Sequence, residues 1–269
     1  MDFVIYFYIF LMGITFGSFF TLAVYRIPLG QDITHNRSYC PNCNHKLSNL
    51  DLIPLFSYIF LRGKCRYCKE KIRPRYFLLE LFSGIVFILF ALSIKMSIYT
   101  INISKIIYFI FGLLYIAGLF IISGIDKEKI QIQTSLLIYL IVIESFYIIY
   151  LYIVEKANIY RYVIQYIAIA ILMIFNVIYY RKKLKNNYTI QNLILLIEML
   201  VFTYEACTIL TIVFTLLSIA IKMIIEKIKG ISRRNIKNNK QTQIPFGFYL
   251  CVTNIITLLI TNILIFYRW

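Results

Sequence analysis

Two C-x2-C pairs are the residues of this chain with the clearest chemical potential. Cys40 and Cys43 form the first pair, and Cys65 and Cys68 form the second after 21 intervening residues. Hairpin turns at such pairs direct both sulfurs to one face, so two pairs can bind one zinc ion tetrahedrally. A redox-active pair is the alternative, but two pairs in one short loop favour metal. Four thiolates close the site to water, so we expect a structural zinc ion.

Acidic residues within apolar segments are the second candidate group. Asp126 ends an apolar run in ISGIDKEKIQIQT, and an ionisable group near membrane depth is a functional candidate because its desolvation is costly. The simpler interpretation is that Asp126 marks where a helix leaves the lipid. Glu80 lies one turn inside another run, while Glu144 and Glu198 lie nearer the middle of theirs. A lone carboxylate more often packs against a polar partner, but two at one depth could act as an acid/base dyad.

The elements that must position these residues are membrane helices. Of 269 residues, 61% are hydrophobic and 15% are charged, whereas a soluble domain is about 45–50% apolar. Apolar runs approach the roughly twenty residues that a helix needs to cross a bilayer. The fold class expected is therefore an all-α polytopic membrane protein with about eight transmembrane helices. Their expected ranges are Phe3–Tyr25, Phe77–Ile94, Ile106–Ile125, Ser135–Val154, Tyr162–Tyr180, Gln191–Tyr204, Ala206–Ile225 and Phe248–Tyr267. The sixth is short, so it is expected to be tilted, partly buried among the others or re-entrant with the seventh.

The basic residues predict an orientation. The loop from Arg26 to Tyr76 holds ten Lys and Arg residues, the segment Arg181–Lys185 holds four, and Lys227–Lys240 holds six. By the positive-inside rule these segments, and the turn after Ile125, are cytoplasmic, with both termini outside. The cytoplasm keeps thiols reduced, which favours a zinc-ribbon-like loop over disulfides. The net charge of +16 is thus explained by the orientation of the helices in a lipid bilayer. We expect no nucleic-acid partner.

Three parts of the chain are expected. Residues 1–25 form the first transmembrane helix, residues 26–76 the cytoplasmic cysteine loop, and residues 77–269 a membrane-embedded helical domain.

Several segments, taken in order, resemble the type IV prepilin peptidases. GSFFTLAVYRIP from Gly17 to Pro28 is similar to that family's GSF-x-N-V-x-x-Y-R-x-P signature, and the two C-x2-C pairs follow at similar spacing. Residues 72–84, IRPRYFLLELFSG, resemble I-S-x-R-Y-P-x-x-E-x-x-T-G. Asp126 falls where the family has its first catalytic aspartate, and residues 244–250, IPFGFYL, resemble I-P-F-G-P-x-L.

This resemblance implies an aspartic-type endopeptidase in the bacterial cytoplasmic (inner) membrane with its active side in the cytoplasm. It would cleave the basic leader from prepilin or pseudopilin precursors, after a glycine. In the family this is often followed by N-methylation of the new N-terminus, with S-adenosylmethionine as the donor. Components of pilus assembly or type II secretion are further implied partners. One ionised aspartate would activate a water while a protonated partner polarises the peptide carbonyl.

The chain departs from the family at the second catalytic aspartate. No G-x-G-D-x-K-L motif is present, and the corresponding stretch, NNYTIQNLILL, places Gln191 or Asn192 near the missing acid. Thr21 replaces the asparagine of the first signature, and Thr134 replaces an acid that follows the first aspartate.

Three interpretations stay open. In an active, divergent peptidase, Asp126 would pair with Glu80, by its membrane level, or with Glu198, by its nearness to the lost motif. A catalytically impaired relative would still bind prepilins or the pilus and secretion assembly machinery. A zinc-ribbon membrane scaffold or transporter-like protein would have no connection to pilins.

Overall fold

The computed structural model describes residues 2–33, 38–183, 187–228 and 244–267. Most of the predicted basic segment Lys227–Lys240 lies outside these ranges, as does the end of Arg181–Lys185. The chain forms two compact units, the first of residues 1–109 and 266–269 and the second of residues 110–265. Each unit is described by itself.

Helices account for the regular structure of the described residues, as the sequence predicts. The main helices are α1 (Asp2–Arg26), α2 (Phe56–Phe60), α3 (Arg75–Ser93), α4 (Ile103–Lys129), α5 (Thr134–Val154), α6 (Tyr160–Lys183), α7 (Tyr188–Phe202), α8 (Glu205–Ile228) and α10 (Phe246–Tyr267). Among the described residues, seven of these are long and apolar enough to cross a membrane. Of the eight expected transmembrane helices, α7 is the one that is too short. Its 15 residues extend about 22 Å, less than the roughly 30 Å thickness of the hydrocarbon core.

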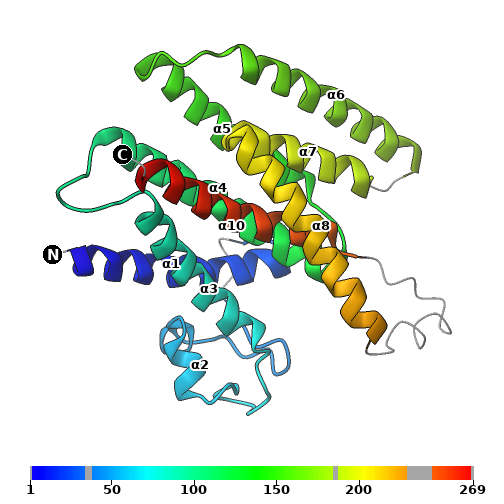
Figure 1. The fold of residues 1–269 in the computed structure, drawn as a ribbon. Coiled ribbons are helices and arrows are strands. Elements are labelled where there is room, and N and C mark those ends of the chain that lie inside the picture. The colour runs from blue at the N-terminus through cyan, green and yellow to red at the C-terminus, as the bar shows by residue number, and fades with distance from the viewer. Residues whose placement is uncertain (1, 34–37, 184–186, 229–243, 268–269) are drawn as a thin grey trace. The chain divides into compact units, whose positions relative to one another are not determined.

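The first unit is built on the close contact of α1 and α3 (Figure 1). A Cβ atom added at Gly13 would lie 2.7 Å from the Cα of Gly84, and one added at Gly17 would lie 2.7 Å from the Cα of Glu80. Small residues four apart let membrane helices approach backbone to backbone, where dispersion contacts replace the missing hydrophobic effect. The Ser83 hydroxyl donates to the Gly13 carbonyl at 2.8 Å. The sequence G-x-x-x-G therefore fixes where the cysteine loop is attached.

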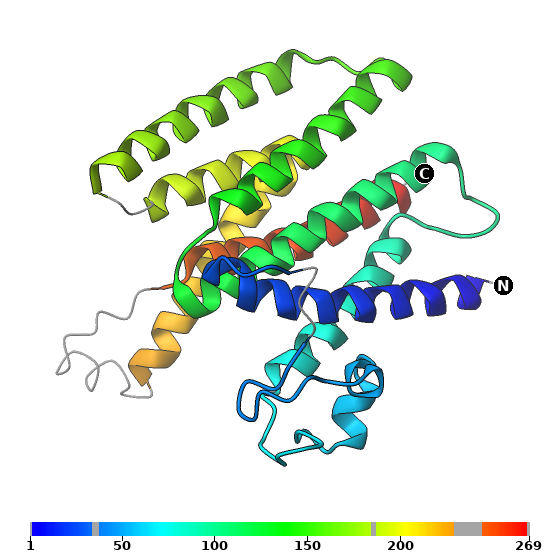
Figure 2. The same cartoon turned by 180° about the vertical axis from the view of Figure 1, so that it is seen from behind.

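The second unit has α10 beside α4, as the two opposite views show (Figures 1 and 2). The Tyr115 hydroxyl donates to Asn254 Oδ1 at 2.9 Å, and Phe248 at the start of α10 contacts Asp126 near the end of α4. The two helices are therefore antiparallel. Buried threonine hydroxyls join α8 to α10, with Thr211 and Thr257 oxygens 2.7 Å apart. In lipid such side chains bond to each other and to carbonyls because no water is available.

Candidate metal centre and buried carboxylate site

The four cysteines lie on two matching turns. Cys40 N–H donates to the His45 carbonyl at 3.0 Å, and Cys65 N–H donates to the Glu70 carbonyl at 2.8 Å. The residue after the second cysteine of each pair, Asn44 or Lys69, has a positive φ of 56° or 60°. This left-handed residue reverses the chain, so that both sulfurs of each pair face the same side.

The sulfurs converge as a zinc ion requires. All four lie within 4.8 Å of one another, and Cys40 Sγ is 3.8 Å from Cys68 Sγ. A tetrahedral zinc ion with bonds of about 2.3 Å holds its sulfurs about 3.8 Å apart. The described cysteines form no disulfide. The donor set therefore fits structural zinc, and the residues that would hold it are the four that the sequence predicts.

Cys43 shows how the cluster responds to metal. The His45 backbone N–H lowers the pKa of its thiol, but desolvation and the neighbouring thiols of Cys40 and Cys68 outweigh it, and the pKa is raised to about 11. Without metal the Cys43 thiol is thus protonated at neutral pH. Zinc binding must release protons, because only thiolates bind the ion.

Asp51 links the second cysteine turn to Ser48, in the segment after the first turn, and was not singled out by the sequence. Its carboxylate accepts from the Ser48 N–H at 3.0 Å and hydroxyl at 2.8 Å, from Arg66 Nε at 2.6 Å and from the Tyr67 hydroxyl at 3.1 Å. Burial pushes the pKa of Asp51 upward, yet these hydrogen bonds outweigh it and the pKa is lowered from 3.8. The only sequence signal was the capping pattern of Ser48 and Asp51.

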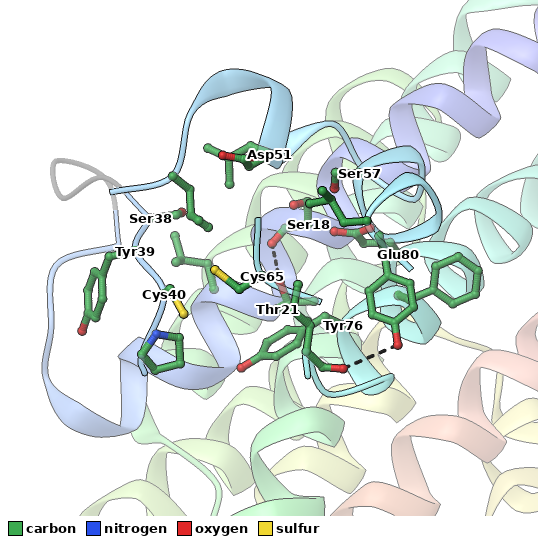
Figure 3. A pocket seen from close by; sticks show the side chains of 18 of the residues that line it. Ser18, Thr21, Ser38, Tyr39, Cys40, Asp51, Ser57, Cys65, Tyr76 and Glu80 are labelled. Carbon is green, nitrogen blue, oxygen red and sulfur yellow. Dashed lines mark hydrogen bonds between the residues drawn. The ribbon is translucent and has the colours of Figure 1, made fainter. Parts of the chain in front are cut away.

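A cavity of about 250 Å³ lies between the cysteine loop and the cytoplasmic ends predicted for α1 and α3 (Figure 3). Glu80 of α3 lines it, and its Oε2 accepts the Leu55 N–H at 2.8 Å. Leu55 has a φ of 61°, a strained conformation for a branched side chain that costs roughly 1–3 kcal/mol. Glu80 thus holds the strained turn that starts α2. It lies in the first unit, whereas Asp126 lies in the second.

Asp126 is fully buried, three residues before the end of α4. Its Oδ2 accepts from the Tyr188 hydroxyl at 2.9 Å and from the Phe248 N–H at 2.8 Å. The first turn of α10 thereby presents its positive end to the carboxylate, which favours an anion there. Oδ1 has no hydrogen-bond partner among the described residues. Ile130 follows with a φ of 50°, a strained position for a β-branched residue.

The start of α7 supplies the other polar side chains of this site. Asn187 caps the helix, since its Oδ1 accepts from the N–H groups of Thr189 at 3.1 Å and Ile190 at 3.3 Å. This fixes Tyr188 in the first turn and Asn192 one turn later. Asn192 Nδ2 donates to the Tyr188 carbonyl at 2.8 Å. Sequence reasoning missed Tyr188, although its i, i+4 spacing from Asn192 places both on one helix face.

The structure decides between the two residues offered for the missing acid. A Cβ atom added at Gly247 would lie 3.2 Å from both Asn192 Oδ1 and Asp126 Oδ2. Gln191 instead reaches Thr134, whose hydroxyl its Nε2 approaches at 3.4 Å. Asn192, not Gln191, therefore faces Asp126 across Gly247.

Glu198 lies with Glu144 in the second unit. Both carboxyl groups are fully buried, and all four oxygens lack a hydrogen-bond partner among the described residues. The hydrogen-bond partners of Asp126 are Tyr188 and Phe248, and Glu198 is not among them.

The fold and the two sites define a class. This is a multi-pass membrane protein whose first unit carries a four-cysteine, zinc-type centre and whose second unit buries a carboxylate at a helix N-terminus.

Comparison with known proteins then points to a family. Residues 11–94 match the bacterial peptidase A24 N-terminal domain. Three relatives carry the name prepilin leader peptidase/N-methyltransferase. The Klebsiella pneumoniae protein is 32% identical over 127 residues, which are 45% of this chain and 52% of that protein. The Myxococcus xanthus protein is 42% identical over 80 residues, 30% of this chain and 24% of its own length. The Vibrio cholerae protein is 43% identical over 79 residues, 26% and 31% respectively.

Over part of its length this chain is therefore similar to the prepilin leader peptidases, in line with the resemblance of its sequence motifs. The chain matches about half of the first relative's length and smaller parts of the others. No solved structure matches it. Asp126 and Asn192 lie outside the matched domain of residues 11–94.

Proposed function

We propose that this protein is a prepilin leader peptidase of aspartic type. It cleaves the basic leader from prepilin or pseudopilin precursors at the cytoplasmic face of the bacterial inner membrane. The observation that carries the proposal is the environment of Asp126. One of its oxygens is held by Tyr188 and the N-terminus of α10, while the other oxygen is unpaired among the described residues.

The chemistry follows from that arrangement. A carboxylate with one oxygen fixed by two donors and one free can accept a proton from a water as a general base. A precursor with a short basic leader and an apolar helix would present its scissile bond at the inner interface. Asp126 lies three residues before α4 ends, at the level predicted for that interface. The relatives' names supply the substrate class.

Methylation of the new N-terminus belongs to the same proposal, because the relatives are also named N-methyltransferases. S-adenosylmethionine would supply the methyl group. The cavity beside the cysteine loop, of about 250 Å³, is smaller than the roughly 300–1,000 Å³ that enclose drug-sized ligands. It is too small to enclose the whole donor, and no residue is assigned to methyl transfer.

The test is cleavage of a co-expressed precursor with a basic leader ending in glycine before an apolar helix. The full-length protein should shorten it, and Asp126→Asn should lower the rate by about 10²–10⁴-fold, the share of a general base. Glu128→Gln is the matched control, because it removes an exposed acid two residues away and should leave the rate unchanged. Equal cleavage by Asp126→Asn would remove the catalytic role.

A second function has one observation in its favour. The chain lacks the second acid, and Asn192 occupies the place opposite Asp126. If the wild-type protein binds the precursor without shortening it, the impaired interpretation holds, and the protein acts in prepilin binding or assembly.

A further inference from the structure

Two neighbouring buried side chains of the second unit each have an acceptor without a partner. Asp126 Oδ1 and Asn192 Oδ1 have no hydrogen-bond donor among the described residues. Asn192 Oδ1 and the other oxygen of Asp126, Oδ2, both lie beside Gly247, since a Cβ atom added there would be 3.2 Å from each. A molecule that donates two hydrogen bonds, such as water, would satisfy both free acceptors.

The orientation of each acceptor is fixed by its neighbours. The Tyr188 carbonyl can only accept, so the amide nitrogen of Asn192 must face it at 2.8 Å, and the amide oxygen points elsewhere. Tyr188 also donates its hydroxyl to Asp126 Oδ2 at 2.9 Å and accepts the Gly247 N–H at 3.2 Å. With Oδ2 held by two donors, Oδ1 is the oxygen left for chemistry.

Gly247 lies beside both side chains. Any side chain there would lie 3.2 Å from Asn192 Oδ1 and from Asp126 Oδ2, and 3.1 Å from Ile132 Cδ1. Gly247 lies in the first turn of α10 and has no positive φ. A glycine is therefore needed here because a side chain would not fit, and not because of the backbone conformation.

We propose that Asn192 replaces the second carboxyl by holding the attacking water, together with Asp126, over Gly247. The inference rests on the proposed peptidase function. The water donates one hydrogen bond to Asp126 Oδ1 and one to Asn192 Oδ1, which leaves an oxygen lone pair free to attack. Asn192 is then a catalytic residue, because it touches the reacting water, and Tyr188 is a positioning residue that acts through Asp126.

The step balances without a second acid. The water oxygen forms a bond to the scissile carbonyl carbon, and its proton moves to Asp126 Oδ1. Asp126 then gives that proton to the leaving nitrogen as the C–N bond breaks. The products are the leader carboxylate and the free amine of the shortened pilin, and Asp126 returns to its ionised form as the new carboxyl group loses its proton.

The first arm of the test compares Asn192→Ala and Gly247→Ala with the wild type, using full-length protein in membranes and the glycine-ended precursor. Asn192→Ala should lower kcat by about 10- to 100-fold with little change in KM, since misplacing a reactant costs on that order. Gly247→Ala should do the same by filling the water position. Gly118→Ala is the matched control. It forces a closer contact, 2.6 Å to Leu140 Cδ2, at a site away from Asp126, and should keep the wild-type kcat.

The second arm separates this role from a structural one. Asn192→Asp introduces a second carboxyl, so the pH profile of kcat should gain a second titration that the wild type lacks. Tyr188→Phe should change the acidic limb of the profile, because Asp126 loses a donor. Unchanged kcat in both Asn192→Ala and Gly247→Ala would overturn the inference and leave the peptidase intact. A wild type that cleaves nothing overturns the peptidase function itself, and recovery of cleavage only in Asn192→Asp overturns the role of the amide.

Discussion

Replacing Asp51 by alanine should loosen the zinc centre without touching a cysteine. The carboxylate accepts four hydrogen bonds, from Ser48 twice, Arg66 and Tyr67. Three of them end on Oδ2 and the Arg66 bond ends on Oδ1, so asparagine can keep three, whereas alanine loses all four. The Asp51 side chain is 3% exposed, and unmade buried bonds cost about 1–3 kcal/mol each.

The ion pair with Arg66 contributes little, because that side chain is 46% exposed and solvent screens the pair to about 0–1 kcal/mol. Tyr67 is also exposed, so only the two bonds from Ser48 count in full, and their loss costs at least about 2 kcal/mol. Because zinc binding is coupled to folding of its loop, this loss should weaken apparent zinc affinity by at least about 30-fold.

The assay is chelator competition on purified full-length protein, with released zinc measured by a coloured indicator. The wild type should hold about one zinc ion, and Cys40→Ser should hold none. Glu70→Gln is the matched control, since it removes one exposed negative charge from the same loop. If Asp51→Ala releases zinc at the same chelator concentration as Glu70→Gln, Asp51 does not hold the second cysteine turn as described. Zinc-free folded wild type would refute the metal centre.

Two further outcomes are expected. Gly17→Ala should lower thermal stability in detergent by about 1–3 kcal/mol or more, because its Cβ would meet the Ser83 hydroxyl and α3 backbone; an unchanged melting temperature would argue against the close packing. Glu198→Gln and Glu144→Gln should keep cleavage, since neither carboxyl is a hydrogen-bond partner of Asp126, and loss of cleavage in a folded Glu198→Gln variant would return Glu198 to the active site.

The membrane helices were predictable because their signal is local and repeated. Each needs only a run of apolar residues long enough to cross the bilayer, and the α5 range found, Thr134–Val154, starts one residue before the predicted Ser135. The short length of α7 could also be predicted, because it follows from the length of its apolar run. The cysteine centre was also predictable, since two C-x2-C pairs fix the ligand set by spacing alone.

The carboxylate site was predictable only in part, because its members come from three helices. Asp126 carried its own signal as an acid at the end of an apolar run. Tyr188 and Gly247 carried none, since a tyrosine and a glycine are ordinary in a membrane helix. Their role depends on α7 and α10 meeting the end of α4. The depth of Glu198 likewise could not show that its carboxyl is not a hydrogen-bond partner of Asp126, because the residues that do contact Asp126 come from α7 and α10.

The departures from the family motif fall in one place in space. The sequence resemblance implies acids at or beside Thr134 and Gln191, whose side chains approach each other at 3.4 Å. Asn192, the next residue, faces Asp126 across Gly247. A second carboxylate beside buried Asp126 would repel it, whereas the neutral amide of Asn192 does not. On the proposed mechanism this neutral partner lets Asp126 stay ionised, and the free oxygens of Asp126 and Asn192 hold the water that Asp126 activates.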